Sequence, residues 1–566
     1  MSMISDKQPI IATYKIDKIK KSFFFNLSIE NQYQKIIYKN KNKNKKINYE
    51  KNFDYCIKIY EKILPDIVKN LNFFYKTNYS IKFWEILIGY WLLRLIQIHK
   101  NYFNDYRACN KKRKIIVSEF DKKIFECNNY SEFNIQTTHF KWNENYISFL
   151  SKYFFKKKNI VILKSKNINK NYLNILNIKN NLIRSKFKKY FFYNLKKENI
   201  IDSHVYFDPL LGRNTDINFR YLINKSKIKF KLYDKKNFQF YKTKFNSFKY
   251  KKNHKLVFNT KKKDIFFQSL FEVITLSLPN EINYYIKKKI KQKLSNKIFT
   301  VGPHLADGLH KFKIAHEIER GSELYLKQLG GVYGTCKNLV SEYFDLKISD
   351  KFLSWGWNHK NKFKTLPSYS NLCDSLKKFT KFNEKKKKRN ILIVGCKLTL
   401  LFREFGSRLQ PEQVYSYIKR NSSLIADLEK KYKNHILFKK HIFLGQCLMT
   451  DMLNKKKLSH VTTDKNFYKL VRNSKLVIHT SNSTTMLETL SINVPTILFW
   501  KKEEWPIHDY VKPLFNDLKK NNIIFYDKDK LIKFINKNYH DFDKWWQAEK
   551  VQNLIIKFNK LFVNTL

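Results

Sequence analysis

Cysteine pairs of the kind that bind zinc are absent: the sequence has no CxxC, and its seven cysteines stand apart from one another. An odd number of scattered cysteines excludes a disulfide framework and a structural zinc site, and it is typical of a reducing compartment. The opening residues MSMISDKQPI contain no apolar signal core. We therefore expect a cytoplasmic protein.

Acidic residues are scarce, with 47 Asp and Glu against 112 Lys and Arg, which gives a formal charge of +65. Such a field attracts nucleic acid, anionic lipid or phosphorylated substrates. No helix-turn-helix or base-stacking motif accompanies it, and Lys is mixed with Asn, Ile, Phe and Tyr along the whole chain, as AT-rich codon usage produces. We expect no specific nucleic-acid partner, and loose peripheral association with an anionic inner membrane.

A long uninterrupted apolar run is also missing. The most membrane-like segment, FWEILIGYWLLRLIQIH, contains Glu85 and Arg94. The apolar stretch between these two charges is too short to span a bilayer. This segment is therefore predicted to be a buried helix.

Hydrophobic residues make up 43% of the chain, enough for large cores in roughly two to four domains. Residues 1–50 form a polar segment, and 51–108 have the apolar spacing of helices. Residues 170–265, approximately, are poorly patterned and are interpreted as a variable insertion with helices. A charged linker at 381–390 separates a predicted N-terminal domain, 51–380, from a C-terminal domain, 391–566.

The C-terminal domain alternates apolar strands with helices. ILIVG, HILFKK, KLVIH and PTILFW are predicted strands, and 411–432, 464–473 and 484–491 are predicted helices. Continuous apolar strands alternating with helices indicate βαβ units and a doubly wound parallel sheet.

The segment HTSNSTTMLETLSINVPTILFW (479–500) places small polar residues between a strand and a helix. Ser483 or Thr484 can cap that helix, whose free N–H groups and dipole form an anion site suited to phosphate. Glu488, one turn further along, can accept hydrogen bonds from ribose hydroxyls. The alternative is an ordinary capped turn with a solvent-facing Glu.

Two further segments carry candidate residues. QLGGVYG (328–334) follows a predicted strand, and its glycines permit close backbone approach or a tight turn. In GPHLADGLHKFKIAHEIERG, His304 and Asp307 precede a helix and are candidate general bases, although a lone histidine is more often structural. Its histidine and glutamate spacing lacks the third ligand of a zinc site. Trp355 and Trp357 are expected in the core rather than stacked on sugar.

These segments resemble a family of transferases attributed to O-antigen and surface-polysaccharide biosynthesis, distantly similar to GT-B glycosyltransferases and bacterial β-Kdo transferases. The resemblance rests on YEKILPDIVKNLNFFYKTNYSIKFWEILIGYWL, LHKFKIAHEIERGSELYLKQLGGVYG, ISDKFLSWGW, LVIHTSNSTTMLETLSINVPTILFWKKEEWPIHDYVKPLFNDL and WWQAEKVQ. It implies a GT-B-like α/β fold, with two Rossmann-like domains facing a cleft and a helical N-terminal elaboration.

The resemblance also implies a reaction. A CMP- or UDP-linked sugar would be the donor and a surface-polysaccharide or lipid-linked glycan the acceptor, without metal or cofactor. The implied donor-binding residues are Ser481, Asn482, Ser483, Thr484, Thr485, Glu488, Lys397, Arg403 and Arg408. The implied acceptor-side residues are the catalytic Asp307 and His304 and the loop residues Gln328, Gly330, Gly331, Tyr333 and Gly334.

One position departs from the family pattern. Leu329 stands where the family's glycine-rich loop has a histidine after the glutamine. If that histidine is catalytic in the family, this chain is altered or inactive; if it only packs, nothing changes. A nucleotide-sugar 2-epimerase-like enzyme and a non-catalytic basic binding protein remain as alternatives, because fold does not settle function.

Overall fold

The computed structural model describes the chain in segments, namely residues 10–11, 49–108, 115–137, 140–163, 203–207, 231–232, 264–287, 296–358, 365–368, 370, 390–396, 398, 405–406, 409–433, 435–439, 461–462 and 467–564. The predicted polar segment 1–50 and the linker 381–390 lie almost entirely outside these residues. The predicted domain bounds therefore stay a prediction.

Two long helices, α2 (Tyr49–Tyr75) and α3 (Ile81–Ala108), confirm the predicted helical segment. The two charges within α3 are buried, as expected for a core helix: Glu85 accepts a 2.8 Å hydrogen bond from the Tyr60 hydroxyl, and the Arg94 guanidinium lies over the Tyr90 ring. Within the described residues, no helix is both long and apolar enough to cross a bilayer.

A small parallel sheet and further short helices complete the N-terminal region; of these helices, α5 and α8 pack against α3. The sheet has the order β1-β2-β3. Its strands are β1 (Ile10–Ile11), β2 (Ile115–Ser118) and β3 (Ile160–Leu163), and the helices are η3 (Lys122–Phe125), α4 (Tyr130–Gln136), α5 (Phe140–Phe154), η4 (Lys157–Asn159), α8 (Ile265–Ser277) and α9 (Glu281–Lys287).

The second sheet is parallel throughout, in the order β5-β4-β6-β7-β8-β9. Its strands are β4 (Ser203–Phe207), β5 (Lys231–Leu232), β6 (Lys297–Val301), β7 (Glu323–Lys327), β8 (Lys351–Ser354) and β9 (Thr365–Pro367), and its helices are α10 (Pro303–Ala306), α11 (Gly308–Glu319) and α12 (Val340–Ile348). The structure corrects one prediction here: the segment interpreted as an insertion with helices supplies β4 and β5. Apolar runs this short, flanked by Lys- and Asn-rich sequence, give too weak a period to reveal a strand.

The third sheet is also parallel, in the order β12-β11-β10-β13-β14-β15. Its strands are β10 (Asn390–Val394), β11 (Ile436–Lys439), β12 (Val461–Thr462), β13 (Ser474–His479), β14 (Thr496–Phe499) and β15 (Ile524–Phe525). The helices around it are α14 (Pro411–Lys431), α16 (Phe467–Arg472), α17 (Thr484–Ser491), η7 (Asp509–Val511), α18 (Lys512–Lys520), α19 (Lys528–Asn538), α20 (Phe542–Trp546) and α21 (Glu549–Phe562). This sheet confirms the doubly wound prediction for the C-terminal part.

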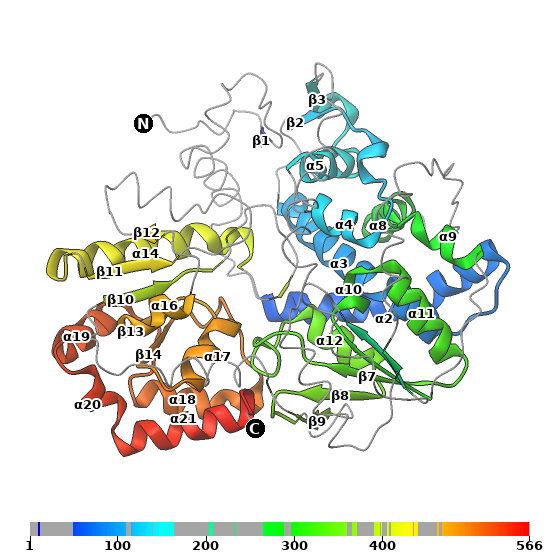
Figure 1. Cartoon of the computed structure of the whole chain (residues 1–566). Coiled ribbons are helices and arrows are strands. Elements are labelled where there is room, and N and C mark those ends of the chain that lie inside the picture. Colours follow the sequence, from blue (N-terminus) through cyan, green and yellow to red (C-terminus); the bar gives the residue numbers. More distant parts are fainter. Residues whose placement is uncertain are drawn as a thin grey trace.

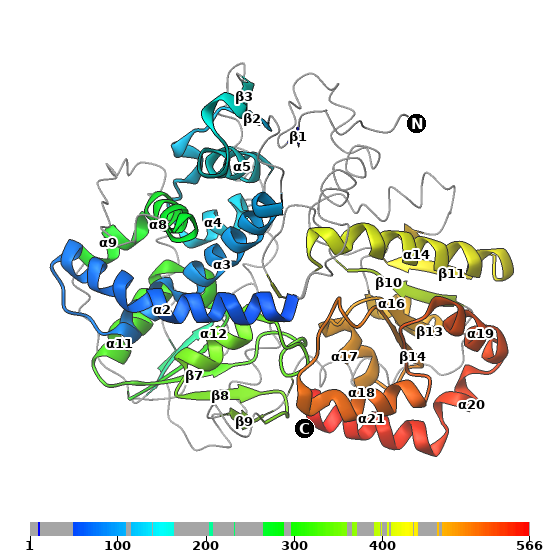
Figure 2. The ribbon, with the colours of Figure 1, turned by 180° about the vertical axis from the view of Figure 1, so that it is seen from behind.

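The two six-stranded units lie side by side, with the yellow-to-red C-terminal unit beside the green part of the chain in both views (Figures 1 and 2). Backbone hydrogen bonds join them, from Lys337 N to Pro506 O at 2.9 Å and from His508 N to Thr335 O at 3.1 Å. After α21 the chain returns to the second sheet, where Asn564 N donates to Trp355 O at 2.9 Å. The structure is thus the predicted GT-B-like α/β architecture with a helical N-terminal region.

Candidate active site

The loop after β13 leads directly into α17 and lies at the carboxyl end of the strand, where open parallel sheets bind ligands. Ser483 is the N-cap residue of α17, in extended backbone conformation, and its side chain makes no capping hydrogen bond. The first N–H groups of a helix have no acceptor within the helix. The N-terminus of α17 therefore offers the N–H donors and the positive dipole end that the sequence predicted for an anion site.

The other small polar residues of this loop differ in what they contact. Ser481 and Asn482 are buried, and Asn482 Nδ2 donates to Thr335 Oγ1, in the other unit, at 3.0 Å. Thr484 Oγ1 accepts a 3.0 Å hydrogen bond from Gly331 N, whereas Thr485 Oγ1 lies 3.0 Å from Ser483 Oγ. Two of the predicted phosphate-binding side chains thus connect the two units.

Glu488 is buried one turn into α17, with 6% of its surface exposed. Within the described residues no hydrogen bond or ion pair to its carboxylate is found, and burial raises its pKa to about 7. A buried carboxylate costs free energy unless it is paired. Glu488 is therefore not the solvent-facing residue of an ordinary capped turn, and its carboxylate is available to a ligand.

The glycine-rich loop after β7 contacts the N-terminus of α17. Gln328 holds the loop from inside: its Nε2 donates to Gly330 O at 2.7 Å, and its Oε1 accepts from Trp355 N and Trp357 Nε1, both at 2.8 Å. Both tryptophans are buried, as predicted for core residues. Gln328 thus positions the loop from within the core.

Two glycines of this loop are required by their surroundings. Gly334 has φ +75°, a conformation that side chains rarely adopt, and its N–H donates to Glu342 Oε2 at 2.7 Å. Gly331 approaches α17 so closely that a Cβ would lie 2.8 Å from Thr484 Cα. Leu329 is half-buried and packs against the main hydrophobic core.

His304 belongs to a buried chain of polar side chains. Its Nε2 lies 2.7 Å from Asp345 Oδ1, and the other oxygen of Asp345 accepts a 2.8 Å hydrogen bond from the Tyr333 hydroxyl. In the described structure, His304 Nδ1 is buried and has no hydrogen-bond partner. A histidine whose one nitrogen is held by a carboxylate presents its other nitrogen in a defined orientation, which is the arrangement of a general base.

Asp307 is the N-cap residue of α11, and its Oδ1 accepts a 3.1 Å hydrogen bond from His310 N. Burial by itself would raise the pKa of Asp307, but the hydrogen bonds and charge of His310 outweigh it and hold the pKa below its ordinary value. A lowered pKa makes a carboxylate a weaker base at neutral pH. The catalytic role predicted for Asp307 stays a prediction.

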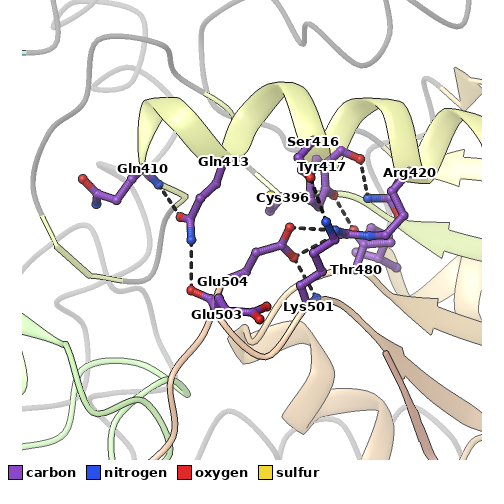
Figure 3. Close-up of polar contacts among 12 residues, drawn as sticks. Cys396, Gln410, Gln413, Ser416, Tyr417, Arg420, Thr480, Lys501, Glu503 and Glu504 are labelled. Atoms are coloured by element: carbon purple, nitrogen blue, oxygen red, sulfur yellow. Dashed lines mark hydrogen bonds and ion pairs between the residues drawn. The ribbon is translucent and has the colours of Figure 1, made fainter. Parts of the chain in front are cut away.

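Sequence reasoning did not identify two carboxylate pairs, one at the junction of the two units and one inside the C-terminal unit. Glu342 on α12 accepts a hydrogen bond from Gly334 N and lies 2.8 Å from His508 Nε2 in the C-terminal unit. Glu504 pairs with Arg420 of α14 through two 2.7 Å hydrogen bonds (Figure 3); Glu504 is buried, and 9% of the Arg420 side chain is exposed. Neither pair has a local sequence signal, because its members lie far apart in the chain.

Polar contacts around Arg420 connect α14 to the loop after β14 (Figure 3). Lys501 N donates to Glu504 Oε2 at 3.0 Å, and Gln413 Nε2 donates to Glu503 O at 2.9 Å. The same loop then continues to His508 and the junction. The Arg420–Glu504 pair thus anchors the segment that leads into the junction.

Replacing Arg420 by Met is expected to lower the free energy of unfolding by about 3–5 kcal/mol, because Glu504 would be left buried without a countercharge. Chemical unfolding measures this change. Lys528→Met is the matched control: Lys528 pairs with Asp427 near the surface, and its loss should cost under about 1 kcal/mol. Equal losses in the two variants would contradict the structural role of Arg420.

The remaining predicted residues, Lys397, Arg403 and Arg408, lie outside the described residues. No group of three or more His, Cys, Asp or Glu side chains that could hold a metal ion occurs within the described segments.

A family model described as LIC12162 family transferase matches residues 24–566. No curated protein matches the chain.

Similar solved structures include MnaA of S. aureus in a co-structure with UDP (10% identity over 62% of this chain and 90% of that chain, TM-score 0.34). An α,α-trehalose-phosphate synthase (UDP-forming) from Burkholderia vietnamiensis is 9% identical over 53% and 74%, with TM-score 0.29. MurG from Acinetobacter baumannii is 11% identical over 60% and 88%, with TM-score 0.26. Likenesses this distant carry no argument about activity.

Proposed function

The chain belongs to the LIC12162 family of transferases, and from this membership we propose that it is a glycosyltransferase. Its donor is a sugar linked to CMP or UDP, and its acceptor is a surface-polysaccharide or lipid-linked glycan, in O-antigen, lipopolysaccharide or capsule biosynthesis. The observation that carries the proposal is Glu488, a buried carboxylate with no partner among the described residues, one turn from the free N-terminus of α17.

The donor side follows from the geometry of α17. A diphosphate or phosphate at its N-terminus accepts hydrogen bonds from the backbone N–H groups of the helix and is stabilised by the helix dipole. Glu488 lies one turn further into the helix, so a ribose attached to that phosphate meets its carboxylate. An ionised carboxylate accepts hydrogen bonds from two hydroxyls, and such bonds offset the cost of burying it.

The leaving group acquires negative charge on its phosphate as the glycosidic bond breaks. In this proposal the N-terminus of α17 and the basic residues Lys397, Arg403 and Arg408 offset that charge, without a metal. Ser483, Thr484 and Thr485 are small and only half-buried, which suits a phosphate beside the backbone.

The acceptor side lies on the loop and helices of the second sheet. Of the two predicted bases, His304 has the better geometry, because Asp345 orients it and Nδ1 is unpaired. Asp307 would then organise the N-terminus of α11 rather than remove the proton. The base deprotonates the acceptor hydroxyl, which attacks the anomeric carbon of the sugar as the nucleotide leaves.

Location follows from the acceptor and the charge. A lipid-linked acceptor is confined to the membrane, and a chain of formal charge +65 is attracted to anionic headgroups. We therefore place the enzyme in the cytoplasm, peripherally at the inner membrane.

Thermal-shift measurements with CMP, UDP and their sugar derivatives test the donor site. One nucleotide class should raise the melting temperature by several degrees, since a ligand that binds only the folded state stabilises it. Glu488→Ala should abolish most of the rise, whereas Glu549→Ala, at an exposed carboxylate on α21, should leave it unchanged.

Three outcomes would contradict the proposal. If no nucleotide changes the melting temperature and the chain binds nucleic acid in a salt-sensitive manner, a basic binding protein is favoured instead. If a UDP-sugar is converted without any acceptor, the chain acts as a 2-epimerase. If Glu488→Ala keeps the full donor affinity, Glu488 does not bind the ribose.

A further inference from the structure

Several hydrogen bonds hold the turn between α2 and α3. Asn72 organises it: Asn72 Oδ1 accepts hydrogen bonds from Thr77 Oγ1 at 3.0 Å, Tyr79 N at 3.1 Å and Trp84 Nε1 at 2.8 Å. The Asn72 backbone oxygen also accepts from Thr77 N at 2.9 Å, and Lys76 takes a positive φ of 53° to close the turn. A turn held by this many hydrogen bonds has a defined shape.

The aromatic residues of the turn fall into two groups. The Tyr75 ring stacks on Trp84 and the Tyr79 ring on Phe83, so both lie against the protein. Phe73, in the last helical turn of α2, is 87% exposed, although it directly precedes this hydrogen-bonded turn. Phe74 next to it is 36% exposed and Ile81 is 48% exposed. The fold therefore presents apolar side chains to the outside at a position where the adjacent aromatics are packed inside.

Basic side chains accompany this apolar tip. Lys69 precedes Phe73 by four residues, so the two lie on one face of α2, and Lys76 follows in the turn; both are exposed. Glu319, the acidic side chain that reaches the turn, is occupied by hydrogen bonds from Ser80 N and Oγ. The nearest exposed acid on α2, Asp66, lies further from the tip than Lys69.

The turn stands at the outer edge of the molecule, on the side away from the C-terminal unit, in both views (Figures 1 and 2). From this edge α3 runs back into the protein, where Phe83 contacts Phe312 of α11 and Gly89 lies against Phe344 of α12. Asp307, the N-cap residue of α11, and Asp345, on α12, belong to the candidate acceptor side. A surface that held the tip would thus set the position of the acceptor side through one continuous helix.

We propose that this docking tip, made of Phe73, Phe74 and Ile81 with Lys69 and Lys76, inserts into the headgroup region of an anionic lipid bilayer. A side chain that is 87% exposed protrudes and suits a soft apolar medium rather than a groove. Aromatic side chains beside lysines form the interfacial anchors of peripheral proteins, because the rings enter the acyl boundary while the ammonium groups pair with lipid phosphates. The inference rests on the proposed function in one respect: a lipid-linked acceptor would be the reason for the protein to dock at the membrane.

Vesicle co-sedimentation of the full-length chain tests the tip. Vesicles of phosphatidylcholine containing phosphatidylglycerol should bind the wild-type chain, and vesicles of phosphatidylcholine alone should bind it more weakly. The variant Phe73→Ser/Phe74→Ser should weaken binding to the anionic vesicles by at least about tenfold, the effect of removing one buried apolar side chain or more. The variant Lys69→Gln/Lys76→Gln should weaken binding to the anionic vesicles less than the Phe variant does. At high salt the Lys variant and wild type should bind these vesicles equally, because salt screens the charge of the lysines.

Ile556→Ser is the control, because Ile556 on α21 is 64% exposed but lies outside the tip. The proposal is overturned if wild type does not bind anionic vesicles, if the Phe73/Phe74 variant binds them as wild type does, or if Ile556→Ser loses as much binding. The nucleotide thermal shift, measured on the same variants, separates the two proposals. A retained shift with no change in vesicle binding overturns docking alone, and a missing shift in wild type overturns the donor site alone.

Discussion

Replacing Glu488 by Gln is expected to stabilise the chain at pH 8 while weakening its binding of nucleotide. The reason is the carboxyl group itself, whose pKa burial raises from an ordinary value near 4.5 to about 7. Between these two values the unfolded chain has released the proton and the folded chain still holds it. The free energy of unfolding therefore falls as pH rises from about 4.5 to about 7, and stays low above that range.

This loss in the free energy of unfolding gives the stability difference expected between wild type and the Glu488→Gln variant. The gap between the two pKa values corresponds to roughly 3 kcal/mol. Gln cannot ionise and has nearly the shape of Glu. At pH 4, below both pKa values, the variant and wild type should be about equally stable, and at pH 8 the variant should be more stable by up to roughly 3 kcal/mol. Chemical unfolding at the two pH values measures the difference, and a gain of equal size at both would contradict the role of ionisation.

Nucleotide binding should respond to pH in the opposite direction. The ionised carboxylate accepts hydrogen bonds from two hydroxyls, one on each oxygen, and its charge strengthens both. The protonated acid and the amide each have only one oxygen that accepts as well, and neither is charged. Wild-type affinity should therefore rise as pH increases through about 7, and the Glu488→Gln variant should show no such rise. A variant that gains stability and loses affinity is the pattern expected of a residue kept for function.

Replacing Gly331 by Ala is expected to disrupt the junction of the two units. The new methyl group would lie 2.8 Å from Thr484 Cα and 2.7 Å from Leu487 Cδ1, both on α17. A backbone atom cannot move aside as a flexible side chain does, so the loop and the helix must separate. The separation also lengthens the hydrogen bond from Gly331 N to Thr484 Oγ1. We expect a loss of about 1–3 kcal/mol in stability and about a tenfold weaker nucleotide affinity.

The adjacent glycine supplies the control. Among the described residues, a Cβ on Gly330 would meet only Thr484 Oγ1, at 3.8 Å, which is an ordinary contact. Gly330→Ala should therefore change stability by no more than about 0.5 kcal/mol and leave nucleotide affinity unchanged. Unfolding and thermal-shift measurements on both variants decide the point. If Gly331→Ala and Gly330→Ala behave alike, the junction tolerates the methyl group, and the close contact between Gly331 and α17 does not affect nucleotide binding.

Elements with a strong local signal were predictable from the sequence. The helix predicted at 484–491 is α17 with the same bounds, and the helix predicted around 411–432 is α14. Both prediction and structure follow from apolar spacing, from a small polar residue at the start of α17 and from a proline at the start of α14. The sequence also predicted that α3 is a buried helix and not a membrane-spanning one, because Glu85 and Arg94 interrupt its apolar run.

The candidate site was predictable in part. The strand–loop–helix pattern placed Glu488 one turn into a helix that begins beyond the carboxyl end of a buried strand. Its burial did not, because a single acidic residue on a short helix reads equally well as solvent-facing. His304 was named as a candidate, but Asp345, which orients it, lies 41 residues away in the sequence and gave no sign of the contact.

The sequence by itself determined that this is an α/β protein with buried parallel strands, a loop of small polar residues before α17 and a glycine-rich loop after β7. These depend on backbone propensity and on the period of apolar residues, which act over a few neighbours. Only the tertiary structure decided that Gly331 contacts Thr484, that Glu342 meets His508 and that Phe73 stays outside while Tyr75 and Tyr79 pack inward. Such contacts depend on how whole elements pack together, and no local pattern encodes which distant residue will fill the space beside another.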